Sequence, residues 1–441
     1  MKTELRFHLT TAASLVGLWL SATSIQAQSG HVLDAVGAVN QSMGGAGTAL
    51  TLDAIGALHW NPASITGLQH SEVGFAFTAF DPDSTISSRV NANGFGPGFP
   101  PTTLQGSTHS DVDVSPIPSL AVVYRDPDSF WSFGLGGFAI GGFGVDYPSD
   151  PNNPILTPQP PLGGMGFGAI YSQFQLMQFC PTAAYEFGNG WSVGFSPTFN
   201  WASLAIDPFS ATTPNANGTY PSASHGDNVW GLGFQAGLYY QSCDTPWTFG
   251  VSYKSPQWFQ TFEMNTVDHL GAPRLATLDL DYPSIVSMGV AYHGLPRTKI
   301  ACDVRYIDYE HTDGFQSAGF DATGAVTGFG WKSIWVVATG VDYELFPKLH
   351  CRAGYTFNQS PIDSSTMFYN APAPALIQHH LSAGFTCELG QGWMWSLAYH
   401  HGFKNSVSGM WYHPVAGPMA SSQVTHSLTT NGITFGLSKR F

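Results

Sequence analysis

Charged residues are scarce in this sequence of 441 residues. Asp, Glu, Lys and Arg together make up 10% of it, whereas soluble domains usually carry roughly 25%. Positive charge is the scarcer sign, with 15 Lys and Arg against 29 Asp and Glu, and the formal net charge is -14. Because nucleic acid is bound by clustered cations that neutralise phosphates, this balance argues against nucleic acid as a partner.

Cysteine is also scarce, and no familiar catalytic or metal-binding motif is present. The five cysteines lack CxxC spacing, which argues against a zinc site or a dense disulfide framework, and an odd number leaves at least one thiol free. The doublets His379-His380 and His400-His401 lie on predicted strands, where neighbouring side chains point to opposite faces. We therefore predict no catalytic residues, no metal and no cofactor; a membrane hydrolase with dispersed Ser and His is the alternative.

Long apolar runs are absent beyond the first 27 residues. That absence excludes a polytopic helical membrane protein, which needs repeated apolar segments of about 20 residues. The one apolar segment, residues 11–22, follows Lys2 and Arg6 and precedes small residues that end at Ala27. This pattern predicts a secretory signal peptide over residues 1–27, with a membrane anchor as the alternative. The exported chain must then be either soluble or a barrel.

Glycine and aromatic residues are abundant instead. There are 50 Gly, 31 Phe, 17 Tyr and 13 Trp, which is too many aromatic residues for a disordered chain. Along residues 191–201 apolar side chains occupy the odd positions and small or polar ones the even positions. The same alternation recurs in residues 247–254, 381–389 and 393–403. Alternating runs of about ten residues are typical of tilted strands that cross a membrane.

Short and long connections alternate between the predicted strands. Short turns are predicted at residues 126–129, 188–190, 242–246, 294–298, 346–348 and 390–392. Long polar loops are predicted near residues 81–116, 146–171, 206–227, 266–282, 311–330, 359–377 and 410–426. Together these connections join fourteen strands, an even number that returns the chain to the periplasm. That number requires residues 247–265 to form one long strand, bent at Pro256.

The last predicted strand ends in an aromatic residue. Ile433, Phe435, Leu437 and the terminal Phe441 share one face, and small or polar residues dominate the other. This ending resembles the C-terminal signature of bacterial outer-membrane proteins. The alternative is a secreted β-sandwich, which would bury its apolar face and leave a charged outer face. Here the polar face consists largely of Gly, Ser, Thr and Asn.

Residues 28–70 lack strand alternation and are rich in small residues. Helical propensity is fair over residues 49–58, and Asn61-Pro62 then favours a turn. Because this segment precedes the first predicted strand, residues 72–80, we do not expect it in the wall. We predict an all-β fold, a transmembrane antiparallel β-barrel of about 14 strands over residues 71–441, with a partly helical plug over residues 28–70.

Two plug motifs carry a family resemblance. Gly44-Gly45-Ala46-Gly47 and Asn61-Pro62-Ala63 resemble the N-terminal hatch of the FadL family, bacterial outer-membrane transporters of long-chain fatty acids and other hydrophobic molecules. The resemblance extends to the whole mature chain in strand count and loop rhythm. It implies fourteen strands around a hatch, an external hydrophobic groove, and a kinked third strand that opens the wall sideways, so that substrate leaves into the bilayer.

The third predicted strand, residues 131–145, contains six glycines. Glycine within a strand weakens the ladder and marks bends or bulges. We therefore predict a kink and lateral opening at Gly141 and Gly142. The equal alternative is that these glycines relieve crowding against the plug.

Four cations are predicted to face the lumen and are candidates to bind a fatty-acid carboxylate: Lys254, Arg305, Lys332 and Arg352. The alternative, which we favour, is that they pair with lumenal acids such as Asp303 or Glu388, because barrel interiors are generally polar. Outside the barrel, loop residues 91–101 and 158–167 mix Pro, Gly and apolar residues and suit a capture site; ordinary flexible loops are the alternative.

The predicted function is passive uptake of hydrophobic molecules, such as long-chain fatty acids or aromatic hydrocarbons, through a plugged barrel with lateral exit. The expected partners are this hydrophobic cargo, outer-membrane lipid and lipopolysaccharide, and the expected state is a monomer in the outer membrane of a Gram-negative bacterium. A general porin is one alternative, but a plug and a lightly charged lumen argue against it. A barrel receptor or adhesin that binds through its loops is another.

Overall fold

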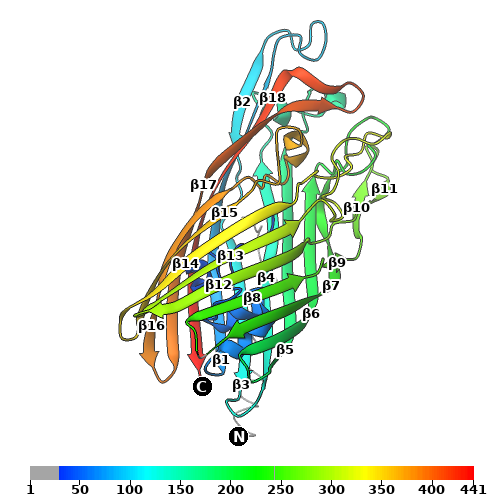
Figure 1. Cartoon of the computed structure of the whole chain (residues 1–441). Helices are drawn as coiled ribbons and strands as arrows, with labels where there is room; N and C mark the ends of the chain where they lie inside the picture. Colours follow the sequence, from blue (N-terminus) through cyan, green and yellow to red (C-terminus); the bar gives the residue numbers. More distant parts are fainter. Residues whose placement is uncertain (1–28, 243) are drawn as a thin grey trace.

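A closed ring of strands forms the molecule. The computed structural model describes residues 29–242 and 244–441, so the predicted signal peptide lies outside the described residues. Within them fourteen antiparallel strands pair in sequence order, and β18 (Gly417–Arg440) closes on β1 (Glu72–Val90), as Figure 1 shows. The other wall strands are β3 (Ser115–Arg125), β4 (Trp131–Tyr147), β5 (Ile170–Glu186), β6 (Trp191–Asp207), β7 (Ala223–Gln241), β8 (Trp247–Lys254), β12 (Ser284–Leu295), β13 (Thr298–Asp308), β14 (Ile334–Phe346), β15 (Leu349–Asn358), β16 (His379–Gly390) and β17 (Trp393–His413). The predicted all-β barrel is confirmed.

The two faces of the wall follow the predicted alternation. Along β8 the aromatic and aliphatic side chains of Trp247, Phe249 and Val251 point outward and are exposed, while Thr248 and Ser252 are buried. The terminal strand β18 does the same with its apolar face. All six predicted short turns lie at or between the ends of consecutive wall strands. A surface of exposed apolar side chains around a buried polar interior is the arrangement of a barrel in lipid.

Three strands extend further than predicted. β1 continues to Val90 rather than ending at residue 80, and it pairs there with β2 (Leu104–His109). β17 and β18 run on through the predicted loop 410–426, which leaves only residues 414–416 between them. These extensions rise beyond the rest of the wall in Figure 1. The prediction was wrong because their side chains lack apolar alternation.

The predicted bent strand over residues 247–265 is also interrupted. β8 ends at Lys254, and pairing with β7 resumes only in β9 (Trp258–Phe259). Between them Ser255 hydroxyl accepts from Phe234 N (3.0 Å), and Pro256 has no N–H to donate. The chain then leaves the wall and forms a separate hairpin of β10 (Phe262–Val267) and β11 (Pro273–Leu278). The ring of fourteen strands still holds, because β8 and β12 pair directly.

Residues 29–70 lie inside the ring (Figure 1). They contain α2 (Ala38–Ser42), α3 (Ala54–Trp60) and the 3-10 helix η2 (Pro62–Gly67). The helix predicted over residues 49–58 therefore begins later, where the Asp53 side chain caps α3 by accepting from Gly56 N (3.2 Å). No helix in the described part of the chain is long and apolar enough to cross a membrane.

The remaining described elements lie in the long connections on the side away from the short turns. They are three short 3-10 helices, η3 (Pro154–Leu156), η4 (Pro160–Leu162) and η5 (Met367–Asn370). Aromatic side chains from these loops are buried against one another, so the loops are packed rather than extended. The four described cysteines are free: Cys180, Cys302, Cys351 and Cys387.

Candidate functional site

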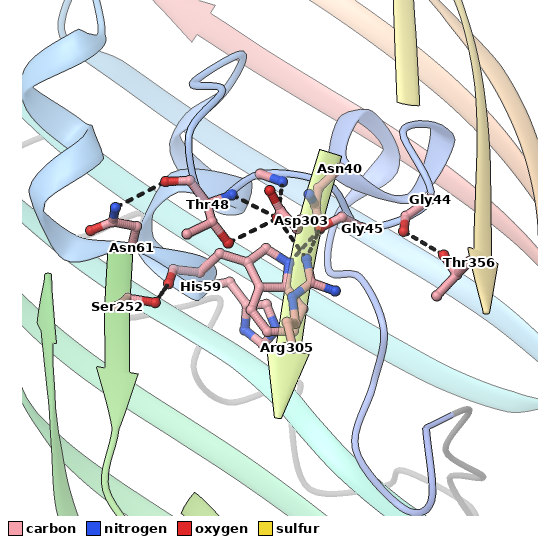
Figure 2. A network of polar contacts seen from close by, with 12 residues as sticks. Asn40, Gly44, Gly45, Thr48, His59, Asn61, Ser252, Asp303, Arg305 and Thr356 are labelled. Carbon is pink, nitrogen blue, oxygen red and sulfur yellow. Dashed lines mark hydrogen bonds and ion pairs between the residues drawn. The ribbon is translucent and has the colours of Figure 1, made fainter. Parts of the chain in front are cut away.

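The first predicted plug motif is seated directly on the wall. Gly44 carbonyl accepts from the Thr356 hydroxyl of β15 (2.6 Å), as Figure 2 shows. Gly45 has φ +80°, and a Cβ there would stand 2.1 Å from the carbonyl oxygen of Asp34. Only glycine fits this left-handed position against another stretch of plug backbone. Ala46 is fully enclosed beside them.

An ion pair on β13, between Asp303 and Arg305, binds the same stretch of plug, and we call this pair the clasp. The Asp303 carboxylate accepts from Gly47 N (2.8 Å), Thr48 N (2.9 Å) and the Thr48 hydroxyl (2.8 Å). Arg305 forms an ion pair with Asp303 (2.9 Å) and also donates to Gly45 carbonyl (Figure 2). Both side chains are almost completely buried. A buried charge is tolerated when it is paired and hydrogen-bonded, which is the case for this carboxylate.

The second predicted motif joins the plug to another part of the ring, at β7. Asn61 Nδ2 donates to Thr48 carbonyl (2.9 Å) and to Leu238 carbonyl of β7 (3.0 Å), while its Oδ1 accepts from Ala63 N (3.0 Å). Pro62 begins η2, where its missing N–H costs no hydrogen bond. Asn61 therefore links both hatch motifs to each other and to the wall.

Wall glycines make room for these contacts. A Cβ on Gly354 would stand 2.1 Å from Gly44 N, one on Gly250 2.0 Å from Thr48 carbonyl, and one on Gly194 2.3 Å from Ala63 N. Each of these glycines lies on the inner face, where any side chain would push the plug away. Part of the high glycine content therefore serves close backbone approach between the wall and the plug.

The four predicted lumenal cations have different environments. Arg305 is part of the clasp, its guanidinium 3.5 Å from the centre of the Trp60 ring. Arg352 pairs with Asp342 (2.7 Å) rather than with Glu388, beside a cavity of about 220 Å³ at the end with the short turns. Arg305 and Arg352 therefore pair with lumenal acids, as in the alternative that we favoured, and are not free to bind a carboxylate.

Lys332 does not line the lumen, which corrects the prediction. It lies in the connection before β14, where its side chain is 60% exposed and pairs with Asp363 (2.6 Å). The error arose because the strand was expected to begin earlier than Ile334. Lys254, by contrast, is buried at the end of β8, and its Nζ has no hydrogen-bond partner among the described residues.

The third wall strand, β4, parts from its neighbour near the predicted glycines. Its pairing with β3 ends at Phe138 opposite Ser119, and its pairing with β5 shifts register between Ala139 and Gly141. Higher up, Asp111 N donates to Asp146 carbonyl (2.7 Å). A window of unpaired β4 edge, residues 139–145, thus lies on the β3 side of the wall.

The start of the plug occupies this window from inside. Leu33 N donates to Ile140 carbonyl (3.0 Å), and Gly142 N donates to His31 carbonyl (2.9 Å). The Leu33 side chain packs in one cluster with Ile117 of β3 and Ala139 of β4, across the seam. We call residues 29–36 the latch. A Cβ on Gly141 would stand 2.3 Å from His31 carbonyl, so this glycine both marks the irregular strand and admits the latch.

A buried apolar cluster adjoins the latch. Its side chains come partly from β4 and β5 and partly from loop residues that fold into the barrel mouth: Phe143, Phe174, Tyr282, Tyr309, Phe315, Phe329 and Trp331. Sequence reasoning placed residues 311–330 in a polar external loop and missed this cluster. The available signal was the aromatic content of that loop, with Phe315, Phe320 and Phe329 between polar residues.

A second aromatic cluster covers the outer end. Phe95 and Phe167 come from the two loops predicted to form a capture site, and both contact Trp411 of β17 (ring centroids 5.3 and 6.4 Å apart). Phe368 of η5 joins them, and a small groove lies between Phe167, Phe368 and Pro372. One aromatic residue from each loop, Phe95 and Phe167, is therefore part of the same packed cluster.

Burial also changes the acid–base behaviour of the plug, which lies outside the spanning strands. Burial raises the pKa of Asp34 to about 6 and that of Asp53 to about 7, and it lowers the pKa of His31 to about 3. The His31 imidazole is therefore neutral at physiological pH.

Comparisons with known proteins agree with this geometry. A family model described as outer membrane protein transport protein (OMPP1/FadL/TodX) matches residues 19–407. The crystal structure of the toluene transporter TodX of Pseudomonas putida is 18% identical, with a TM-score of 0.66, and the match covers 93% of this chain and 99% of that one. The toluene transporter TbuX of Ralstonia pickettii is 20% identical (TM-score 0.64; 93% and 99% covered). A FadL homologue of Pseudomonas aeruginosa is 15% identical (TM-score 0.66; 95% and 99% covered). A search of curated protein sequences gives no match.

Proposed function

Since the chain belongs to the outer membrane transport family of OMPP1, FadL and TodX, we propose that it carries hydrophobic molecules into the cell by passive diffusion with lateral exit between β3 and β4. It is an outer-membrane transport protein, and its cargo class is hydrophobic, as in long-chain fatty acids or aromatic hydrocarbons. The toluene transporters TodX and TbuX, which share its fold, support the second kind of cargo.

One observation carries the proposal of lateral exit. The wall has an edge at residues 139–145 that does not pair with β3, and the latch rather than a neighbouring strand bonds the Ile140 carbonyl and the Gly142 N. Unpaired edges are rare in barrels, because closure of the ring normally satisfies every backbone group. A window closed by a segment of the plug opens when that segment moves, without breaking the ring elsewhere.

The proposed path runs from outside to this window. Cargo first contacts the outer aromatic cluster around Trp411, then passes among the buried aromatic side chains around Phe315, and leaves past Leu33 into the bilayer. Each stage offers apolar surface, so movement is downhill by partition toward the membrane interior. No chemical step belongs to this route.

Lys254 is the remaining candidate for a carboxylate partner among the four predicted cations, because its Nζ lacks a hydrogen-bond partner among the described residues. We expect Lys254→Gln to lower uptake of labelled oleate and to leave uptake of labelled toluene unchanged, since toluene has no carboxylate. Lys332→Gln, at the exposed pair with Asp363, serves as the control. Equal loss of both cargoes in Lys254→Gln would remove this role.

The proposal also covers the molecules that surround the barrel and its oligomeric state. The exposed aromatic and aliphatic outer face suits membrane lipid, and the polar extensions of β1, β17 and β18 beyond it suit contact with lipopolysaccharide. Because one chain closes the ring, the protein is proposed to act as a monomer.

The decisive experiment tests whether the latch must move for cargo to leave, by joining it to β4 with a disulfide. In reconstituted vesicles the protein should take up labelled oleate or toluene but not a labelled sugar, and the pair Leu33→Cys with Ala139→Cys should abolish uptake when oxidised. Reduction should restore it, and each single cysteine variant is the matched control. Sugar flux without hydrophobic uptake would indicate a porin, and full uptake by the oxidised pair would exclude exit at this seam.

A further inference from the structure

The His31 side chain lies inside a box of aromatic rings. Its imidazole stacks on one of them almost in parallel (10° between the planes), and the others surround it at angles of 41° to 83°. The centroid distances from the imidazole are 4.8 Å to Phe315, 5.4 Å to Tyr282, 5.4 Å to Tyr309, 5.8 Å to Trp331 and 6.0 Å to Phe174. The side chain is completely buried there.

The box offers the imidazole nothing polar. Neither ring nitrogen of His31 has a hydrogen-bond partner among the described residues. The polar atoms of the box are engaged elsewhere: Trp331 Nε1 donates to Asn370 Oδ1 (2.5 Å), and the Tyr309 hydroxyl donates to Ser29 carbonyl (2.8 Å). A buried polar atom without a partner is costly, so the box fits a ring of carbon better than the imidazole that fills it.

His31 also holds the window closed. Its carbonyl accepts from Gly142 N (2.9 Å) at the unpaired edge of β4, and its own N donates to the Tyr309 hydroxyl (3.1 Å). The side chain in the box and the backbone bond at the seam thus belong to one residue. A molecule that displaces the imidazole from the box removes the support of the latch at the same time.

From this arrangement we propose that the His31 imidazole occupies a binding site for cargo while the seam is closed. The cargo that opens the seam is a neutral, flat, single-ring aromatic molecule that takes the place of the imidazole in the box. This inference rests on the proposed function and deepens it by naming the cargo that triggers exit. The neutral state of the imidazole agrees with it, because the box has no group to balance a charge. An unbranched alkane cannot stack on Phe315, even when it is more hydrophobic than toluene, and leaves the latch in place.

The experiment measures opening of the latch directly. Purified full-length protein in nanodiscs is titrated with toluene or with decane, and amide hydrogen exchange is followed in peptides that cover residues 29–36 and 139–145. Toluene is expected to raise exchange in both peptides, and decane is not. Equal responses to the two hydrocarbons overturn the proposal.

Two substitutions at His31 shift this response in opposite directions. His31→Phe keeps a stacked ring without unpaired nitrogens, so about fivefold more toluene is expected for half-maximal exchange. His31→Ala removes the ring and all of its packing in the box, so less toluene is expected than in the natural protein. His426→Phe is the matched control, since His426 is equally buried but lies outside the box. A titration unchanged in both His31 variants, or shifted in the same direction, overturns the proposal.

Uptake of labelled toluene is measured on the same preparations. Uptake without a toluene-specific exchange response contradicts the role of His31 and leaves the proposed transport intact. Absence of uptake for every hydrophobic probe contradicts the proposed function itself. Migration of the heated and unheated protein on gels verifies that each variant forms a folded barrel.

Discussion

Two of the regions where the plug touches the wall are held in different ways. On the side of β13 and β15, the clasp of Asp303 and Arg305 gathers several buried, charge-assisted hydrogen bonds around Gly45 and Thr48. On the side of β4, the latch is held by backbone bonds of Leu33 and His31 and by apolar packing. Charge-assisted buried bonds are about twice as strong as neutral ones. The difference indicates a fixed anchor at one side and a movable closure at the other.

Removal of the clasp is expected to have the largest effect. Asp303→Ala leaves Arg305 as an unpaired buried charge and removes the acceptor from three plug donors. The free energy that holds the plug against the wall should fall by about 3–5 kcal/mol. We expect ion conductance through the barrel to appear in planar bilayers, with the wall still folded. Asp363→Ala, at the exposed pair with Lys332, should give no ion conductance. Absence of ion conductance in Asp303→Ala would show that the clasp is not the anchor.

Crowding of the anchored side should have an intermediate effect. Gly354→Ala sets a methyl group 2.1 Å from Gly44 N, and overpacking of this kind costs about 1–3 kcal/mol. Hydrogen exchange of the plug around residues 40–50 should rise while that of the wall stays constant. Gly74→Ala is the control, because its nearest neighbour is an Ile55 side-chain atom at 3.4 Å. The same change in both variants would mean that wall glycines do not set the seat of the plug.

Weakening of the latch should have the smallest effect on stability but a visible one on transport. Tyr309→Phe keeps the ring but loses the hydrogen bonds to Ser29 and His31, worth about 1 kcal/mol. We expect faster uptake and faster exchange in residues 29–36, with unchanged exchange around Thr48. Tyr399→Phe, whose hydroxyl donates to Asn431 Oδ1 on the neighbouring wall strand, is the matched control. Slower uptake in Tyr309→Phe would contradict a movable closure on this side.

Much of the wall and part of the site could be predicted from sequence. The outward side chains of β8, the six short turns and the irregularity near Gly141 all follow from patterns within a few residues. The upper parts of β1 and β17 were missed because they carry little apolar alternation. A bend at Pro256 was predicted, but the departure of the chain from the wall after β9 was not. The inward direction of Lys254 was predicted, but whether any cation already had a partner was not.

Which faces meet lipid and which meet the lumen follows from the order of residues alone, because side-chain direction along a strand repeats every two residues. Which inward residues meet one another depends on how the strands pair. Asp303 reaches Thr48, and His31 reaches Phe315, across more than 250 residues of chain. Those meetings depend on the register with which each strand pairs and on the closure of β18 on β1. A shift of one residue in register reverses the faces of a strand, so the seat of the plug and the closure at β4 are properties of the whole ring.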